Sequence, residues 1–324
     1  MSELRFDQVS VRYGRGRNAL TAVDQVSLLV PSGKVVGLVG ESGSGKSTLA
    51  RTSVGLAPIS AGRVSFGDTD LSVLRRQGKY PLQMIFQDPY GSLNPRMTIG
   101  ECIAETMPRG RRSSRGLRRA EARRLLELVN LEPATADALP GRLSGGQRQR
   151  VALARALAGK PSVIVADEIT SALDVSVQGS VLNTVRELQR ELSLGMLFIS
   201  HNLAVVRYVS DFIAVMYLGR VVEAGPAEEI LANPRHPYTQ ELLLAAAHED
   251  SLLGDLSAAP IGAVEPADPH RPPAGCRFHP RCPIGPALRT DREICATVEP
   301  LLPVVAGPAA ACHFSAELRP ATSN

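Results

Sequence analysis

The sequence has no tryptophan, only 4% aromatic residues and no apolar stretch that approaches the roughly 20 residues needed to cross a bilayer. Because that apolar stretch is missing, we expect that the chain does not span a membrane by itself. Charged residues make up only 21% of the sequence, which argues against a wholly disordered chain or a coiled coil. With 324 residues, 44% of them hydrophobic, the chain is long enough for a full core and about two domains.

A secretory signal is also missing from the start of the sequence. The first ten residues, MSELRFDQVS, do not place an apolar segment after a charged one. We therefore expect the chain to remain in the cytosol. In that compartment its five cysteines would not form disulfides.

Lysine is scarce among the basic residues. Only four of the 36 are lysine, and eight arginines lie between Arg109 and Arg124. No aromatic residue interrupts this segment, which argues against nucleic-acid binding through base stacking. We interpret the arginines as the solvated face of a helix, with docking on a membrane protein or an acidic lipid as the alternative. The predicted apolar face of that helix comprises Leu117, Ala120, Arg124, Leu125 and Leu128.

Strand and helix patterns alternate over the first 250 residues. Short β-branched runs occur at 35–39, 84–86, 163–166, 196–199 and 213–217, and helical patterns follow several of them. This alternation predicts an α/β fold with a largely parallel sheet covered by helices. Residues 91–150 interrupt it with helical, arginine-rich sequence, which predicts an inserted helical subdomain.

The composition changes near residue 250. Residues 251–324 contain 12 of the 24 prolines and four of the five cysteines. Proline at this density excludes mainly regular helix or sheet, so the segment needs another source of order. We expect a small Cys/Pro-rich C-terminal extension that folds separately from the rest of the chain.

A complete phosphate-binding loop follows the first of these predicted strands. The strand at 35–39 leads into Gly40-Glu-Ser-Gly-Ser-Gly-Lys-Ser-Thr48, and a helical pattern follows. The glycines let backbone N–H groups surround phosphates, and the next helix directs its positive end at them. Lys46 would contact the outer phosphates and Ser47 would ligate Mg²⁺.

Two further motifs also suit the binding of a nucleotide phosphate and Mg²⁺. The apolar strand at 163–166 ends in Asp167 and Glu168, where a carboxylate lies beside a bound nucleotide. Asp167 is then expected to hold Mg²⁺ through water, and Glu168 to activate the attacking water. Ser144 precedes Gly145 and Gly146 at the start of a predicted helix, which forms a second anion-binding helix end.

These motifs, in this order, resemble the ABC-family ATPases. The resemblance rests on the phosphate loop, the LSGGQ segment 143–147, the Asp167-Glu168 pair, the segment 171–174 and an isolated histidine, His201. It implies that Gln87 contacts Mg²⁺ and water near the permease, that Tyr13 packs on adenine and that His201 contacts the γ-phosphate. Catalysis is thereby assigned to Glu168, His201 and Gln87, and Mg²⁺ to Ser47, Gln87 and Asp167. Nucleotide binding is assigned to Tyr13, Gly40, Glu41, Ser42, Gly43, Ser44, Gly45, Lys46, Ser47, Thr48, Ser144, Gly145, Gly146, Gln147 and Asp174.

The resemblance also implies a dimer in which the two ATPase chains stack head to tail. Ser144, Gly145 and Gly146 would then act on the nucleotide of the partner chain. One chain has a single copy of each motif, so it cannot complete either site alone. ATP is expected to close the dimer, and its hydrolysis to release it.

Longer segments resemble one subfamily, the ATP-binding subunits of bacterial oligopeptide, dipeptide and nickel importers. These segments are 86–95, 171–178, 215–225, 236–239 and the cysteine-containing tail. They imply an ABC ATPase domain at 1–235 and a C-terminal extension at 236–324. The implied partners are a second ATPase, two permease subunits and, indirectly, an extracytoplasmic binding protein, with the chain on the cytoplasmic face of the membrane. A soluble ABC ATPase acting on ribosomes or DNA is the alternative function, and it predicts a second ATPase domain or a coiled-coil insert, which this sequence lacks.

One residue departs from the family pattern. Ile169 follows Glu168 where the family usually has proline. Without that proline the backbone of Glu168 is less restricted, so we expect looser positioning of the attacking water.

The tail cysteines leave three interpretations open. Cys276, Cys282, Cys295 and Cys312 follow the spacing C-x5-C-x12-C-x16-C. An all-cysteine set suits an iron–sulfur cluster, and relatives in the resembled subfamily carry a [4Fe-4S] cluster on such a tail. The alternatives are zinc, for which the missing C-x2-C pairs are less natural, and unligated buried thiols. Cys102 is interpreted as a small buried apolar residue.

Overall fold

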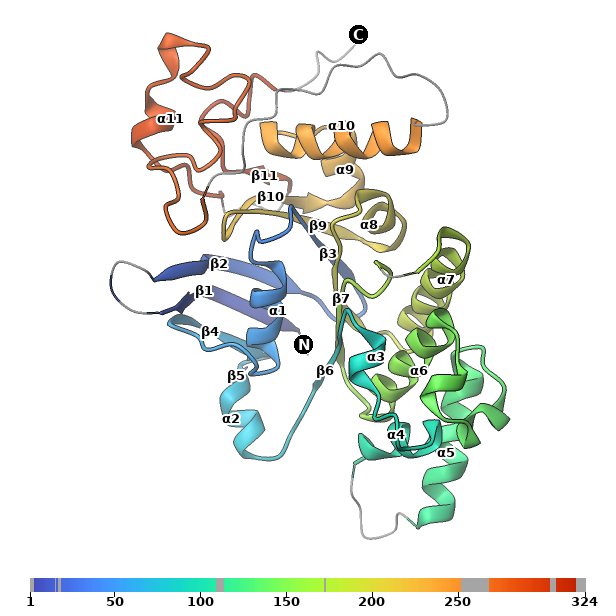
Figure 1. The fold of residues 1–324 in the computed structure, drawn as a ribbon. Helices are drawn as coiled ribbons and strands as arrows, with labels where there is room; N and C mark the ends of the chain where they lie inside the picture. The colour runs from blue at the N-terminus through green and yellow to red at the C-terminus, as the bar shows by residue number, and fades with distance from the viewer. Residues whose placement is uncertain are drawn as a thin grey trace.

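The computed structural model describes residues 3–14, 16, 19–108, 114–171, 173–251, 268–303 and 307–318. Figure 1 shows a central sheet with an antiparallel sheet on one side and a group of helices on the other. The C-terminal segments lie together at the top of this view.

Within the described residues, the central sheet has seven strands in the order β11-β10-β9-β3-β8-β7-β6. The strands from β9 to β6 pair in parallel, which confirms the predicted parallel sheet. All residues of β3, β7 and β8 are buried, because helices or the second sheet cover both faces. The strands are β3 (Val35–Val39), β6 (Leu82–Ile85), β7 (Val163–Asp167), β8 (Gly195–Ile199), β9 (Phe212–Tyr217), β10 (Arg220–Pro226) and β11 (Ala309–Ala310).

A second, antiparallel sheet was not predicted from the sequence. Its order is β2-β1-β4-β5, with β1 (Leu4–Tyr13), β2 (Leu20–Val30), β4 (Ala61–Phe66) and β5 (Thr69–Asp70). The register between β1 and β2 shifts three times, and Gln8 and Gln25 have positive φ angles of 48° and 50°. Such irregularities break the alternation of apolar and polar residues by which a strand is recognised.

The helices surround the central sheet. The described part of residues 89–158, which leaves out only 109–113, contains α3 to α6 and no strand. This agrees with the predicted helical insert near 91–150. The helices are α1 (Lys46–Ser53), α2 (Leu71–Arg76), α3 (Pro89–Ser92), α4 (Ile99–Glu105), α5 (Arg115–Leu128), α6 (Gly145–Ala158), α7 (Val175–Glu191), α8 (Leu203–Val209), α9 (Ala227–Ala232), α10 (Pro237–Ser251) and α11 (Ile294–Thr297). Short 3₁₀ helices lie at Pro133–Asp137, Pro140–Arg142 and Thr290–Arg292.

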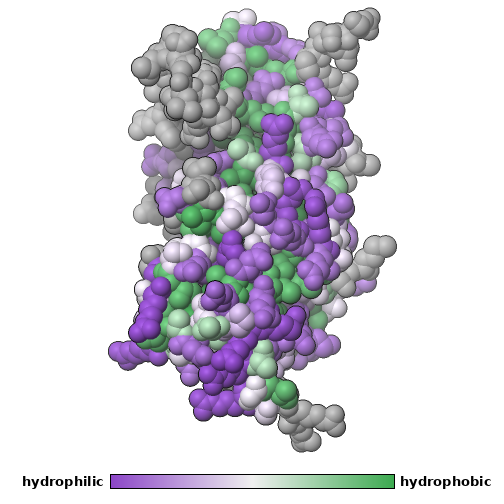
Figure 2. Space-filling model, turned by 90° about the vertical axis from the view of Figure 1, so that its right-hand side faces the viewer, coloured by the Kyte–Doolittle hydropathy of each residue, from purple (hydrophilic) through white to green (hydrophobic). Residues whose placement is uncertain are grey.

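The first part of the arginine cluster, residues 109–113, lies outside the described residues. The remaining arginines of the cluster lie on helix α5. The predicted apolar face is wrong in its first half: Leu117 is 61% exposed and Ala120 is exposed, whereas Ala122, Leu125 and Leu126 are buried. Only the second half of the helix packs on the core. Figure 2 faces this side of the molecule, and hydrophilic side chains dominate its lower part.

The outward arginines of α5 pair with carboxylates of the same chain. Arg119 and Arg123 each donate to Asp137, at 2.7 and 2.9 Å, and Arg124 pairs with Glu121 at 2.8 Å. These exposed ion pairs agree with a solvated face, where such pairs contribute little to stability.

The C-terminal extension is not packed as a separate unit, contrary to the expectation from its composition. Strand β11 extends the central sheet by pairing with β10, where Glu223 faces Ala310 and Ala224 faces Ala309. Phe278 is 1% exposed and belongs to the main hydrophobic core. The boundary between residues 235 and 236 therefore remains a prediction from sequence, and the segment 252–267 lies outside the described residues.

Parallel pairing brings the chemically important residues to one edge of the central sheet. The phosphate loop follows β3, Gln87 follows β6, Glu168 follows β7 and His201 follows β8. The carboxyl ends of parallel strands meet at the same edge, which is where open α/β sheets bind ligands.

Candidate nucleotide site

The phosphate loop is fixed by two glycines that have no room for a side chain. Gly40 has φ 150°, and a Cβ there would lie 2.1 Å from the carbonyl oxygen of Met216. Gly45 has φ 103°, and a Cβ there would lie 2.2 Å from the carbonyl oxygen of Ala22. Any larger residue at either position would displace the backbone of a neighbouring strand.

Lys46 is the first residue of α1 and is only 4% exposed. Its ammonium donates to the carbonyl oxygens of Gly40 and Glu41, each at 2.7 Å. Burial lowers the pKa of Lys46, although nearby Glu168, Asp167 and Glu41 oppose this shift. The ammonium therefore lies inside the loop, at the place from which it can reach phosphate oxygens.

Ser47 and Asp167 are brought together as the sequence predicts. The hydroxyl of Ser47 donates to Asp167 Oδ1 at 2.8 Å. Asp167 is 3% exposed, and burial raises its pKa while the Ser47 hydrogen bond lowers it. Hydroxyl and carboxylate oxygens are the ligands that Mg²⁺ prefers, so this pair has the right donor chemistry for the ion.

Glu168 is contacted by the two other residues that were assigned to catalysis. Gln87 Nε2 donates to Glu168 Oε2 at 2.9 Å, and His201 Nδ1 lies 3.4 Å from Glu168 Oε1. The Glu168 side chain is 16% exposed and that of His201 is 57% exposed, so the group opens to solvent. A carboxylate in this setting can accept a proton from a water molecule.

The backbone at Glu168 is in the left-handed region, with φ 48°, and its N–H donates to the carbonyl oxygen of Ile199. The next residue, Ile169, is 3% exposed and packs in the main core. Isoleucine thus anchors this turn by burial where the family usually has proline. The predicted looser positioning of the attacking water remains a prediction.

The LSGGQ segment forms the start of α6, and the side-chain hydrogen bonds of Ser144 and Gln147 stay within this helix end. The hydroxyl of Ser144 accepts from the backbone N–H of Gln147, and the Gln147 side chain accepts from the Ser144 N–H. Gly146 has no room for a side chain, because a Cβ would lie 2.3 Å from Val177 Cγ1. Ser144 and Gln147 are exposed.

Two other predicted residues, both among the described ones, make no hydrogen bond or ion pair with the loop. Tyr13 ends β1 and is 40% exposed. Asp174 is an exposed residue that precedes α7, and its side chain does not cap that helix. Their assignment to nucleotide binding therefore remains a prediction.

A set of C-terminal residues that contact the phosphate loop was not predicted from the sequence. Arg281 pairs with the Glu41 carboxylate at 3.0 Å and also with Glu241. The phenol of Tyr238 accepts a hydrogen bond from the Glu41 N–H at 2.8 Å. Arg281 and Tyr238 lie within segments that resemble the importer subfamily, but local patterns do not tell which residue they contact.

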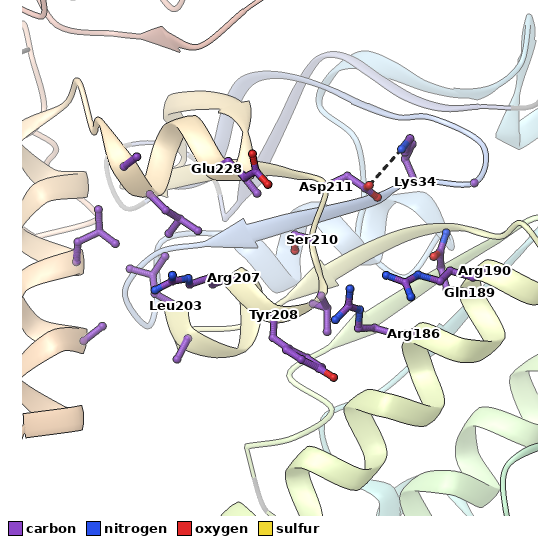
Figure 3. Close-up of a pocket in the computed structure, with 18 residues that line it drawn as sticks. Lys34, Arg186, Gln189, Arg190, Leu203, Arg207, Tyr208, Ser210, Asp211 and Glu228 are labelled. Atoms are coloured by element: carbon purple, nitrogen blue, oxygen red, sulfur yellow. Dashed lines mark hydrogen bonds and ion pairs between the residues drawn. The ribbon is translucent and has the colours of Figure 1, made fainter. Parts of the chain in front are cut away.

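A cavity of about 810 Å³ lies away from these motifs. Figure 3 shows it between α7, α8 and α9, near the start of β3, with Lys34 paired to Asp211 at 3.2 Å. None of the residues assigned to nucleotide lines it. It is therefore not the nucleotide site.

The four tail cysteines line one small cavity, and all their thiols are free. Burial raises the pKa of each thiol, to about 12 for Cys276 and about 11 for Cys312. They are consequently protonated at neutral pH when nothing binds them. Cys102 is 2% exposed and its Sγ lies 3.8 Å from the Asn94 carbonyl oxygen, as expected for a buried residue outside the tail.

Comparison with known proteins identifies the family. The family model described as "ABC transporter" matches residues 23–171. The family model described as "Oligopeptide/dipeptide transporter, C-terminal region" matches residues 222–287. A Sinorhizobium fredii protein named "Probable peptide ABC transporter ATP-binding protein" is 47% identical over 300 residues, which cover 91% of this chain and 83% of the relative. This chain belongs to the ABC transporter family. A Brucella ovis protein named for peptide import ATP binding is 43% identical over 87% of this ABC ATPase and 88% of the relative.

Solved structures support the same fold for this ABC ATPase. A dimeric, post-hydrolysis ATP-binding cassette bound to ADP and phosphate is 30% identical, with a TM-score of 0.61, over 69% of this chain and 98% of that one. A subunit of a Clostridium perfringens ABC transporter complex has a TM-score of 0.63 at 24% identity, over 77% of this chain and 98% of that one. The sequence-based expectation of an ABC ATPase core is confirmed.

Two substitutions separate binding from chemistry in this ABC ATPase. We expect Lys46→Ala to weaken ATP binding, because it removes the buried ammonium from the loop. Glu168→Gln should keep ATP binding and slow hydrolysis by on the order of 10²-fold or more, since the amide cannot accept a proton. Equilibrium nucleotide binding and single-turnover hydrolysis on the assembled transporter distinguish them. Unchanged turnover in Glu168→Gln would remove that residue from its role.

Proposed function

We propose that this chain is the ATP-hydrolysing subunit that energises uptake of peptides, or of a related small solute, through an ABC importer. The proposal rests on the observation that one chain combines an ATPase site with a transporter-type C-terminal region. The first holds the Gln87, Glu168 and His201 group beside a phosphate loop, and the second matches the oligopeptide/dipeptide transporter C-terminal region. The names of the relatives at 43–47% identity support the same solute class.

The proposed chemistry assigns each contact of the site a role. Lys46 leaves the carbonyl oxygens of the loop to hold the outer phosphates of ATP. Ser47, Gln87 and Asp167 would hold Mg²⁺, and the ion would supply charge neutralisation at the phosphates. Glu168 accepts a proton from the attacking water while His201 holds the γ-phosphate. The hydrogen bond from Gln87 orients the Glu168 carboxylate before the reaction begins.

A second chain is needed to complete each nucleotide site. Ser144, Gly145 and Gly146 are at the start of α6, where they would face the nucleotide of a partner. The capping box between Ser144 and Gln147 holds this helix end in shape. We propose the partner to be a second ABC ATPase, a paralogue or a further copy of this chain.

Other partners follow from the importer role. We propose two permease subunits as the membrane-spanning part and an extracytoplasmic binding protein as the source of selectivity, with this chain on the cytoplasmic face. No helix within the described residues is long and apolar enough to cross a bilayer. We propose that Gln87 lies near the permease contact, as the family resemblance implies.

Reconstitution tests the importer role. We expect the chain to co-purify with two permeases encoded beside it, and its ATPase rate to rise when a peptide-loaded binding protein is added to proteoliposomes. Glu168→Gln complexes, which still bind ATP, serve as the control for uptake. Sedimentation with ribosomes, with no stimulation by any loaded binding protein, would instead support the rival soluble ATPase.

The head-to-tail arrangement makes a separate prediction. Ser144→Arg should leave the ATP affinity of the isolated chain nearly unchanged, because Ser144 does not contact its own phosphate loop. It should block ATP-dependent dimer closure, because the bulky cation faces the partner's nucleotide. Nucleotide titration and light scattering of the same variant measure both properties. Loss of ATP binding by the isolated variant would contradict the arrangement.

We also propose a [4Fe-4S] cluster on the tail, held by Cys276, Cys282, Cys295 and Cys312. All four thiols line one cavity, and backbone N–H groups hydrogen-bond three of the sulfurs. Such N–H donors stabilise thiolates that bind a cluster. The donor residues, each two positions beyond its cysteine, are Phe278, Ile284 and Phe314.

The four cysteines could in principle hold either zinc or an iron–sulfur cluster. Among the residues that the structure describes, no group of three or more His, Cys, Asp or Glu side chains could hold a metal ion as placed. A single zinc ion requires thiolates drawn tightly together, at about 2.3 Å from the ion. Four cysteines without C-x2-C pairs favour an iron–sulfur cluster over such a zinc site. When bound, the cluster would tie the tail into one unit.

Colour and protease resistance test this tail site. Purified without oxygen, the protein should be brown, with broad absorbance near roughly 400 nm. Cys282→Ser should bleach it and expose the tail to protease, whereas Cys102→Ser, a matched change at a buried cysteine outside the cavity, should not. A colourless preparation with stoichiometric zinc would overturn the cluster assignment. A metal-free preparation with a protected tail would contradict any metal.

A further inference from the structure

Glu41 places a carboxylate inside the phosphate loop, one residue after Gly40. Arg281 Nη1 donates to both of its oxygens, at 3.0 and 3.2 Å. The two residues are 240 positions apart in the sequence, so the C-terminal extension folds back to reach the loop. A second contact from the C-terminal segments holds the same residue, because the Glu41 N–H donates to the Tyr238 phenol at 2.8 Å.

Arg281 is held firmly in this position. Its side chain is 12% exposed, and its other terminal nitrogen pairs with Glu241 of α10. The guanidinium lies 5.6 Å from the Phe278 ring centroid and 5.9 Å from that of Tyr217. Burial by itself would lower the Arg281 pKa, but the carboxylates of Glu41 and Glu241 outweigh it and the pKa is raised. The group is therefore a fixed positive charge.

The Tyr238 phenol, which accepts the Glu41 N–H, is also held rigidly. It is fully buried, and its ring centroid lies 4.6 Å from that of Tyr217 and 5.5 Å from that of Phe278. Burial raises the pKa of the phenol, so it remains neutral. The backbone and the side chain of Glu41 are thus both fixed by residues beyond the ATPase motifs.

A carboxylate in a phosphate-binding loop has an electrostatic cost. The loop must surround a triphosphate, and an uncompensated negative charge at Glu41 would repel it. A charge-assisted pair with both oxygens engaged compensates that charge and also fixes its direction. The conformation of the loop and its affinity for phosphate therefore both depend on Arg281.

We propose that Arg281 is a positioning residue for ATP binding: it neutralises Glu41 and fixes the start of the phosphate loop from the C-terminal extension. The inference rests on the assignment of this loop to ATP. It gives the extension a direct part in nucleotide binding, through an arginine that directly precedes Cys282.

Arg281→Gln on the full chain tests the proposal, with MgATP as the probe. We expect the Kd for MgATP to rise about five- to tenfold, the size expected for loss of one charge-assisted pair. In the assembled transporter the KM for ATP should rise with little change in kcat. Arg277→Gln is the matched control, because Arg277 is also 12% exposed and also pairs with two carboxylates, Asp24 and Glu299, outside the loop. It should leave the Kd unchanged.

A second substitution distinguishes charge compensation from general damage. Adding Glu41→Gln to Arg281→Gln removes the uncompensated carboxylate, so the Kd should return to within about twofold of the wild type. Arg281→Lys keeps the charge without the two-pronged geometry and should weaken binding by about two- to threefold. It replaces Arg281→Gln in the comparison if the latter does not fold.

Three outcomes would overturn the proposal. They are an unchanged Kd in Arg281→Gln, an equal loss in Arg277→Gln, and no recovery in the double variant. Lys46→Ala in the same titration separates this failure from that of the ATP assignment itself. If Lys46→Ala abolishes binding while Arg281→Gln does not alter it, the loop binds ATP without help from Arg281.

Discussion

The position of Ile199 in the central sheet determines the geometry of the whole nucleotide site. Ile199 pairs with Leu38 on one side and with Asp167 on the other, and its carbonyl oxygen accepts the Glu168 N–H. One residue of β8 thus sets the distance between the phosphate loop and the carboxylate pair, and His201 follows two positions later. A shift of one residue in either pairing would turn these side chains to the other face of the sheet. The Ser47–Asp167 and His201–Glu168 contacts both depend on this register.

How far the sequence predicts the structure depends on the range of the interaction. The parallel strands and the phosphate loop were predictable, because a short buried run followed by glycines and a helix is a local pattern. The contact between Glu41 and Arg281 was not, since no local rule relates residues 240 positions apart. The antiparallel sheet was missed because the bulges at Gln8 and Gln25 break its alternation.

The helical face of α5 shows a second kind of limit. Periodicity indicated that Leu117 and Leu125 share a face, yet Leu117 is exposed because the core reaches only the second half of the helix. The spacing of residues predicts which side chains point the same way, but not how far the neighbouring elements extend. The same reasoning applies to Ser144, for which we propose a role on the nucleotide of a partner chain that one sequence does not contain.

Strand β11 has only two residues, yet it lies along the outer edge of the central sheet. It pairs with Glu223 and Ala224 of β10, and the Ala311 N–H donates to the Val222 carbonyl oxygen at 2.7 Å. An uncovered edge strand presents unpaired backbone groups to which another chain can add by strand pairing, and so favours aggregation. The C-terminal extension therefore also covers part of the β10 edge, which leaves less of that strand open to self-association by strand pairing.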